Sequence, residues 1–210
     1  MPYQVVIDTL AEEYGRPIEE IFSHIDSKPL GSASLAQVHR ATLVTGEDVA
    51  VKVQRPGVSE TMAQDVSIMR SLAKVAAKLF PDAQIVDFKG VVEELWDTFE
   101  AETDSLVEAR NLAAFKRFSK PYKYMDCPAP YPELCTEHVV VMDYIDGISV
   151  SHPKQLLAAG YDLKEIGTKL VDNYATQILD EGFFHADPHP GNIIVRGGQI
   201  VLIDLGMTGR

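Results

Sequence analysis

The order of apolar and polar positions predicts an amphipathic helix followed by a strand pair at the start of the chain. Apolar residues recur at helical spacing over residues 3–14; Gly15 ends this helix, and Pro17 opens a short second one. Residues 35–44 and 48–54 predict two strands that meet at the turn "TGE". In the second strand, valines alternate with other residues at period two, which is typical of a β-strand with two different faces.

Two long helices and further strands are expected after this hairpin. Residues 59–80 predict a helix that Pro81 stops, and residues 89–118 predict a second one. Four prolines in residues 119–133 indicate an irregular linker. The remaining pattern consists of a buried strand in "HVVVMDYIDG", a helix over residues 162–181, and two short strands, "NIIV" and "IVLID", around "RGGQ".

Composition narrows the classes of protein that fit this pattern. The chain has 210 residues and is 46% hydrophobic, which is enough to bury a core in one domain or two small lobes. A net charge of -12 argues against binding to nucleic acid, which needs a basic face. Cys127 and Cys135 fit neither a disulfide framework nor a zinc pattern, so we expect free thiols in a reducing compartment.

The sequence carries no targeting or membrane-spanning signal that we recognise. The start, "MPYQVVIDTLAEEYGRP", is acidic and lacks the profile of a signal or transit peptide. No uninterrupted apolar run is long enough to cross a bilayer, so we expect no transmembrane segment. We therefore expect a cytoplasmic location or one peripheral to a membrane, with an organelle as an open alternative.

The densest group of special residues is "FFHADPHPGNIIV", residues 183–195. Three interpretations compete. A metal site would use His185, Asp187 and His189, but no further His or Cys cluster follows and the prolines rule out a regular strand. A simple turn fits "PHPG" but does not explain the other polar residues. The pattern H-x-D-x-x-x-x-N is also that of the catalytic loop of kinase-type phosphotransferases, and we favour this third interpretation.

The kinase-type interpretation assigns a role to each polar residue of the loop and requires one more carboxylate. Asp187 would accept the proton of the attacking hydroxyl, and Asn192 would bind Mg²⁺. The further carboxylate should stand at the end of a strand just downstream, and "IVLIDLG" supplies Asp204 there. ATP and Mg²⁺ are therefore the expected cofactors.

The same interpretation makes two demands upstream, and the sequence meets both. In "VAVKV", Lys52 would neutralise phosphate oxygens, and Ala50 on the same face would leave space for an adenine ring. A loop of small residues should come one strand earlier, so that backbone N–H groups can approach phosphates. That place is taken by "GSAS": Gly31, Ser32, Ala33 and Ser34.

These motifs together resemble one family. "PLGSASLAQVH", "VAVKVQRPGV", "ETDSLVEARN" and "HADPHPGNIIV" resemble the UbiB/ADCK atypical protein-kinase-like proteins, which are linked to ubiquinone biosynthesis and lipid homeostasis. The resemblance implies that Glu108 pairs with Lys52 and that Glu102 and Asp104 form the family's E-x-D motif. It also implies that Ala33 belongs to an alanine-containing loop in place of the usual glycines. Lipid or quinone-pathway proteins would be partners.

The resemblance also implies an α+β fold with the two lobes of a protein kinase. We expect an N-terminal helical segment over 1–26, a small lobe over 27–145 with an antiparallel sheet and long helices, and a partial large lobe over 146–210. The family's K-x-G-Q motif does not occur, and the sequence ends six residues past Asp204. We therefore expect an incomplete helical large lobe.

Two other functions stay open at this point. Small-molecule phosphotransferases of the aminoglycoside and choline kinase type also carry an H-x-D-x-x-x-x-N loop, but "VAVKVQRPGV" together with "ETDSLVEA" favours the UbiB interpretation. A pseudokinase or truncated nucleotide-binding scaffold is the non-enzyme alternative. The intact set of phosphate and metal ligands argues against this scaffold, while the missing ends argue for it.

Overall fold

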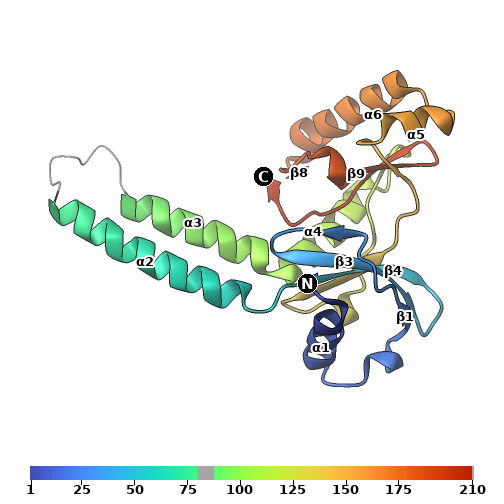
Figure 1. Cartoon of the computed structure of the whole chain (residues 1–210). Helices are drawn as coiled ribbons and strands as arrows, with labels where there is room; N and C mark the ends of the chain where they lie inside the picture. Colours follow the sequence, from blue (N-terminus) through green and yellow to red (C-terminus); the bar gives the residue numbers. More distant parts are fainter. Residues whose placement is uncertain (80–87, 210) are drawn as a thin grey trace.

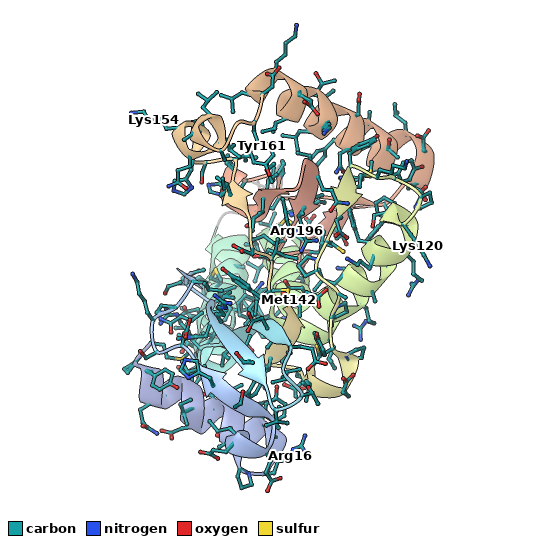
Figure 2. All side chains as sticks on the ribbon, turned by 90° about the vertical axis from the view of Figure 1, so that its right-hand side faces the viewer. Arg16, Lys120, Met142, Lys154, Tyr161 and Arg196 are labelled. Carbon is teal, nitrogen blue, oxygen red and sulfur yellow. The ribbon has the colours of Figure 1, made fainter. Side chains whose placement is uncertain are left out.

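A computed structural model describes residues 1–79 and 88–209, and for part of the two long helices it describes the backbone alone. Figure 1 shows the small-lobe sheet with helix α1 beneath it and helices α5 and α6 on the opposite side of the molecule. Helices α2 and α3 project from the small lobe as a long hairpin. In the second view, Met142 lies between the lobe that carries Arg16 and the lobe that carries Tyr161 (Figure 2).

The small lobe contains an antiparallel sheet. Its strands run in the order β1-β3-β4-β6, with β2 also paired to β3. Their bounds are β1 (Phe22–Ile25), β2 (Gly31–Ser32), β3 (Ala36–Leu43), β4 (Asp48–Gln54) and β6 (Val139–Asp143). The hairpin predicted from residues 35–44 and 48–54 is confirmed, and β1 is an edge strand that the pattern analysis missed.

Strand β4 has two different faces, as its period-two pattern predicted. Val49, Val51 and Val53 are fully buried in a core that they share with helix α1 (Tyr3–Tyr14) and the 3₁₀ turn η1 (Ile18–Glu20). Ala50, Lys52 and Gln54 therefore point to the opposite side of the sheet, because successive strand residues face opposite ways. That side faces the second lobe.

The helices between β4 and β6 differ from the sequence-based expectation in one respect. Helix α2 (Val58–Leu79) agrees with it; the predicted stop at Pro81 lies outside the described residues. The single helix expected over residues 89–118 is wrong: the structure has α3 (Phe88–Thr103) and α4 (Ser105–Ser119). Asp104 has an extended backbone and accepts a hydrogen bond from the N–H of Leu106, so it caps the start of α4.

The segment 119–133 is less irregular than its prolines suggested. It contains β5 (Met125–Asp126), which pairs in parallel with β10, and the 3₁₀ turn η2 (Pro132–Leu134). The Asp126 carboxylate forms two ion pairs, with Lys116 of α4 at 2.5 Å and with Arg196 of the second lobe at 2.9 Å. This segment therefore links α4 to the second lobe. The expectation of a linker without regular structure is therefore wrong in part.

The second lobe packs α5 (Pro153–Ala158) and α6 (Leu163–Ala175) beside small sheets. The larger of these sheets has the order β5-β10-β9-β7 and the smaller pairs β11 with β8. The remaining bounds are β7 (Ile148–Ser149), the π-helical turn η3 (Thr176–Glu181), β8 (Phe184–His185), the 3₁₀ turn η4 (Pro190–Asn192), β9 (Ile193–Arg196), β10 (Gln199–Leu202) and β11 (Thr208–Gly209).

One apolar core joins the two lobes. It contains Ala50 and Met142 from the small-lobe sheet, Leu112 from α4, and Leu156 and Ile200 from the second lobe. The described residues include no helix that is both long and apolar enough to cross a bilayer. The fold is thus α+β with antiparallel sheets and long helices, and a cleft lies where the two lobes meet.

Candidate active site

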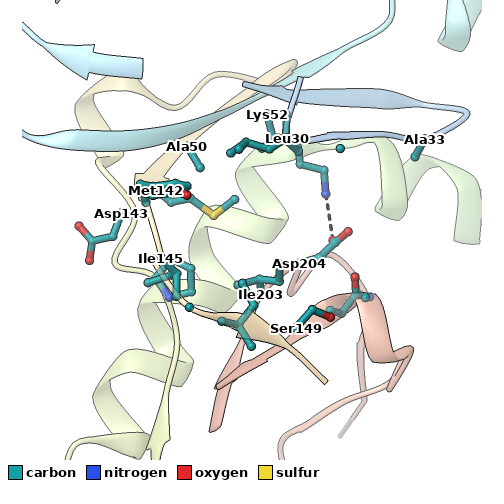
Figure 3. Close-up of a pocket in the computed structure, with 18 of the residues that line it drawn as sticks. Leu30, Ala33, Ala50, Lys52, Met142, Asp143, Ile145, Ser149, Ile203 and Asp204 are labelled. Carbon is teal, nitrogen blue, oxygen red and sulfur yellow. Dashed lines mark hydrogen bonds and ion pairs between the residues drawn. The ribbon is translucent and has the colours of Figure 1, made fainter. Parts of the chain in front are cut away.

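A cavity of about 530 Å³ lies between the lobes. Its size is in the range of pockets that hold drug-sized molecules and cofactors. Figure 3 shows Leu30, Ala50 and Met142 on the small-lobe side and Ile203 and Asp204 on the other. The apolar part of the wall suits a flat ring, while the end near Lys52 is charged.

Lys52 is the centre of the charged end. Its Nζ atom lies 2.8 Å from Glu108 Oε2 and 2.9 Å from Asp204 Oδ1. The Glu108 side chain is 5% exposed and that of Asp204 is 47% exposed, so the lysine links a buried carboxylate to one that reaches solvent. The expectation that Lys52 and Glu108 lie within ion-pair distance is confirmed, and Asp204 joins them.

The pKa values of the three groups follow from burial and from these contacts. Burial alone would lower the pKa of Lys52, but Glu108 and Asp204 outweigh it and raise this pKa above its ordinary value. Burial raises the pKa of Glu108, although Lys52 opposes the shift. For Asp204, burial also acts upward, but the attraction of Lys52 prevails and lowers its pKa. The solvent-reaching carboxylate is therefore the one that stays ionised most readily.

Asp204 is held in an unusual backbone conformation. Its φ angle is 63°, the left-handed region, where it is alone among the non-glycine residues that the structure describes. Such a conformation is uncommon outside glycine, although Asp and Asn tolerate it best, and it recurs at functional sites. The adjacent Leu205 is fully buried, and its carbonyl accepts a hydrogen bond of 2.9 Å from Asn111 of α4. Helix α4 thus positions both Glu108 and the turn that carries Asp204.

The loop around Asp187 is held in place by its histidines. His185 is buried; its Nδ1 accepts a hydrogen bond from the N–H of Asp187 at 3.0 Å, and its Nε2 donates to the Ile203 carbonyl at 3.3 Å. Burial lowers the pKa of His185, in keeping with a neutral ring that has this tautomer. His189 Nδ1 accepts from the N–H of Gly191. Each histidine uses its Nδ1 atom to shape a turn, and these contacts do not favour the metal site considered from His185, Asp187 and His189.

Asp187 and Asn192 are brought together by this loop. Asn192 Nδ2 donates to Asp187 Oδ2 at 3.1 Å, which leaves its amide oxygen for another partner. Asn192 and Asp204 both line the large cavity, whereas Asp187 lines a smaller one beside it. The two proposed metal ligands therefore face the nucleotide-sized space, and the proposed base faces its neighbour.

The segment "GSAS" forms a short strand and a tight turn over the cavity. Gly31 and Ser32 pair with β3, and the N–H of Ala33 donates to the carbonyl of Ala36 at 2.9 Å. Gly31, Ser32 and Ala33 line the large cavity, and Ser34 lines the smaller one. The loop thus lies where the sequence placed it, one strand before β4.

Arg55 holds the turn of Ser32 and Ala33 in place, a role that the sequence analysis did not predict. Its Nε donates to the Ala33 carbonyl at 3.1 Å and its Nη2 to Ser32 Oγ at 3.0 Å. This residue fixes the turn to the end of β4. The only signal in the sequence was its place directly after "VKVQ", where "RP" served only as a strand breaker.

The structure describes the side chain of only one of the two acidic residues of the E-x-D motif. Asp104 caps α4 and lies 3.4 Å from Arg110, and it does not line the large cavity. A cofactor-binding role for Asp104 has no support in these contacts, because its carboxylate already serves the helix start. Glu102 lies in α3, and its side chain is outside the described part of the structure.

The donor set fits a magnesium ion that is held partly by phosphates. The described residues contain no group of three or more His, Cys, Asp and Glu side chains that could hold a metal by themselves. Mg²⁺ usually binds through one or two carboxylates together with substrate phosphates. Asp204 and Asn192, which face the same cavity, offer oxygen ligands of this kind.

Comparisons with known proteins agree with this fold. The profile of the ABC1 atypical kinase-like domain matches residues 1–210, so the chain belongs to this atypical kinase-like family. "Probable protein kinase UbiB" of Pseudomonas fluorescens is 38% identical over 98% of the chain and 40% of its own length. A Clostridium pasteurianum protein, "Uncharacterized protein in hydrogenase 1 5'region", is 42% identical over 94% of the chain and 37% of its own length.

A solved structure shows the same fold. The Rv3197–erythromycin complex of Mycobacterium tuberculosis is 30% identical, and its TM-score is 0.84 over all of this chain and 52% of the other. The chain spans about two fifths of the length of the two curated relatives named above. The family and the kinase-like kind of protein are therefore established, and the activity is a matter for proposal.

Proposed function

We propose that the chain is the ATP- and Mg²⁺-binding part of an atypical kinase or ATPase of the UbiB type. The observation that carries this proposal is Lys52, held between the buried Glu108 and the exposed Asp204 at the charged end of a nucleotide-sized cavity. A cation fixed by two carboxylates at the end of an apolar pocket is suited to bind phosphate oxygens.

Each residue has a distinct part in the proposed mechanism. The apolar wall around Ala50 takes the adenine, the turn of Ser32 and Ala33 covers the phosphates, and Lys52 neutralises their charge. Asn192 and Asp204 would hold Mg²⁺, which supplies further charge neutralisation when it is bound. Asp187 would orient the attacking oxygen and accept its proton.

The link to ubiquinone biosynthesis or lipid homeostasis is part of the same proposal and rests on family membership. A location in the cytoplasm or at a membrane surface, with lipid or quinone-pathway proteins as partners, is proposed on the same ground. We also propose that the nucleotide is shared between a small lobe over residues 27–145 and a partial large lobe over 146–210, with 1–26 as an N-terminal helical segment.

Nucleotide binding and phosphate release by the purified chain test the proposal. We expect ATP to bind with an affinity that falls when magnesium is chelated, and phosphate to be released slowly. Equal ATP affinity with and without magnesium would contradict the assigned metal ligands. Magnesium-dependent binding without phosphate release would identify the second candidate, a nucleotide-binding scaffold without turnover.

A further inference from the structure

A second cavity of about 210 Å³ adjoins the large one on the far side of Lys52. The two cavities share the ion-paired residues Lys52, Glu108 and Asp204. The smaller cavity is further lined by Gln54 and Asp187. It is therefore the space that adjoins both the phosphate-binding lysine and the proposed base.

The large and the small cavity follow one another along strand β4. Ala50, Lys52 and Gln54 lie on one face of the strand, with successive members about 6–7 Å apart because a strand rises about 3.3 Å per residue. Ala50 lines the large cavity, Lys52 lines both, and Gln54 lines the small one. If the adenine lies at Ala50 and the phosphates at Lys52, the next position along the strand faces the group beyond the last phosphate.

Gln54 has a feature that a purely structural residue would not need. It is 7% exposed, and its carbonyl oxygen Oε1 is buried without a hydrogen-bond partner among the described residues. Glu108 Oε1 is likewise buried without a hydrogen-bond partner among the described residues, while Glu108 Oε2 accepts a hydrogen bond from Lys52. An unpaired buried acceptor destabilises a fold, and such groups call for a functional explanation. Both atoms are acceptors, so a ligand that donates hydrogen bonds would satisfy them.

We propose that the small cavity is the phosphoryl-acceptor site and that Gln54 binds a hydroxyl group of a small polyhydroxylated alcohol. The inference rests on the proposed nucleotide function and deepens it. A cavity below the size of ordinary ligand pockets, about 300–1,000 Å³, admits a small molecule or the tip of a larger one. Carboxylate and amide oxygens in its wall favour a ligand that is rich in hydroxyl donors.

The transfer step follows from this placement. The hydroxyl oxygen of the acceptor attacks the γ-phosphorus of ATP, and its proton passes to the Asp187 carboxylate. The bond between the γ-phosphorus and the β,γ-bridging oxygen breaks, and ADP leaves with that electron pair. The products are a phosphate monoester and ADP, and Gln54 Oε1 holds a hydroxyl of the acceptor in position.

Glycerol and myo-inositol serve as probes in the test, with the phosphate monoester measured by phosphorus NMR. We expect the wild-type chain to form the ester from at least one probe. Gln54→Leu should raise the KM for that probe about tenfold, the effect of one lost hydrogen bond together with the desolvation of its partner. Its affinity for ATP and magnesium should stay within about twofold of wild type, because Gln54 does not line the nucleotide cavity.

Stability supplies a second measurement that does not depend on turnover. Because Gln54 Oε1 has no partner among the described residues, its replacement by an apolar side chain should leave the melting temperature unchanged or raise it. Gln54→Met, which is unbranched and of similar length, serves if Gln54→Leu does not fold. Gln199→Leu is the matched control: this half-buried residue donates to the Lys123 carbonyl, lines neither cavity, and should leave ester formation unchanged when replaced.

The outcomes separate the two levels of the proposal. A wild-type chain that does not bind ATP with magnesium contradicts the proposed nucleotide function itself. A chain that binds and hydrolyses ATP but forms no ester from either probe overturns the acceptor site alone. So does a Gln54 variant that keeps the wild-type KM, or one that loses stability as a structural glutamine would.

Discussion

At the scale of single residues, the site depends on a lysine that holds two carboxylates in different surroundings. Glu108 is buried and Asp204 reaches solvent, and both lie within 3 Å of Lys52 Nζ. Removing one partner of a buried ion pair leaves the other charge without compensation, which costs far more than the pair itself contributes. Lys52 therefore matters for stability as well as for the proposed phosphate binding.

Lys52→Met should lower the free energy of unfolding by about 3 kcal/mol at neutral pH. The loss should shrink as the pH falls. Burial raises the folded-state pKa of Glu108, and without Lys52 it rises further, so the folded state binds a proton that the unfolded chain does not. The stability tied to this proton is present at low pH and is lost as the pH rises through the folded-state pKa.

Urea denaturation at a series of pH values measures this effect. The double variant Lys52→Met/Glu108→Gln is the control, because it has no carboxylate at position 108 left to protonate and should regain most of the stability. A loss in Lys52→Met that is equally large at acidic and neutral pH would show that Glu108 is not the group responsible.

Asp204→Asn and Asp187→Asn should separate magnesium binding from proton transfer. Asn tolerates the left-handed backbone of Asp204, so the first variant removes a charge without straining the turn. We expect it to weaken ATP binding only when magnesium is present. Asp187→Asn should leave ATP binding nearly intact and lower turnover, because the proposed role of its carboxylate lies mainly in the transition state.

Titration with ATP, first with magnesium and then with a chelator, distinguishes the two variants. Matching magnesium-dependent affinities in wild type and Asp204→Asn would refute the role of this residue as a metal ligand. Equal losses of melting temperature in both variants, without a selective effect on ATP, would mean that the aspartates only stabilise their turns.

At the scale of secondary-structure elements, the sequence predicted the helices and strands that have a clear periodicity of their own. The alternation in "DVAVKVQ" fixed which face of β4 carries Lys52, because one apolar face must be buried. The break between α3 and α4 was missed because apolar residues recur at helical spacing on both sides of it, although the stripe is interrupted at Glu102 and Thr103. The signal was Asp104 followed by Ser105, since an aspartate that caps a helix start competes with helix continuation.

The turn of Ser32 and Ala33 over the cavity owes its shape to a contact that no local pattern shows. Arg55 donates to the Ala33 carbonyl and to Ser32 Oγ, which are more than twenty positions away in the sequence. Arg55→Met keeps most of the length of the side chain and removes these donors. We expect ATP affinity to fall about three- to tenfold, since the turn would lose two hydrogen bonds that hold it over the cavity.

Fluorescent-nucleotide binding measures this loss, and Arg117→Met, an exposed arginine on α4, is the matched control. Thermal stability should change little, because Arg55 makes these contacts near the surface. Unchanged ATP affinity in Arg55→Met would exclude the turn from nucleotide binding.

At the scale of the whole molecule, the sequence motifs predicted the fold and the contact between residues far apart in the chain. The apolar and polar pattern could not predict how the two lobes pack against each other. Lys52 and Asp204 stand 152 positions apart, and only the kinase-type interpretation, which assigns both residues to one site, implied that they would meet. The parallel pairing of β5 with β10 could not be foreseen, because a two-residue strand among prolines has no periodicity. The shared core around Cys127 likewise depends on tertiary contacts alone.

This shared core predicts that the two lobes unfold together. Cys127 is fully buried among residues of α4, the small-lobe sheet and the second lobe, and burial raises the pKa of its thiol to about 12. In a Cys135→Ser background, alkylation of Cys127 should therefore require global opening of the core. We expect its urea dependence to share one midpoint with the loss of helical circular dichroism. If the thiol reacts at clearly lower urea than the helices melt, the lobes separate before they unfold, and the second lobe is a weaker unit that the cleft residues do not hold in place.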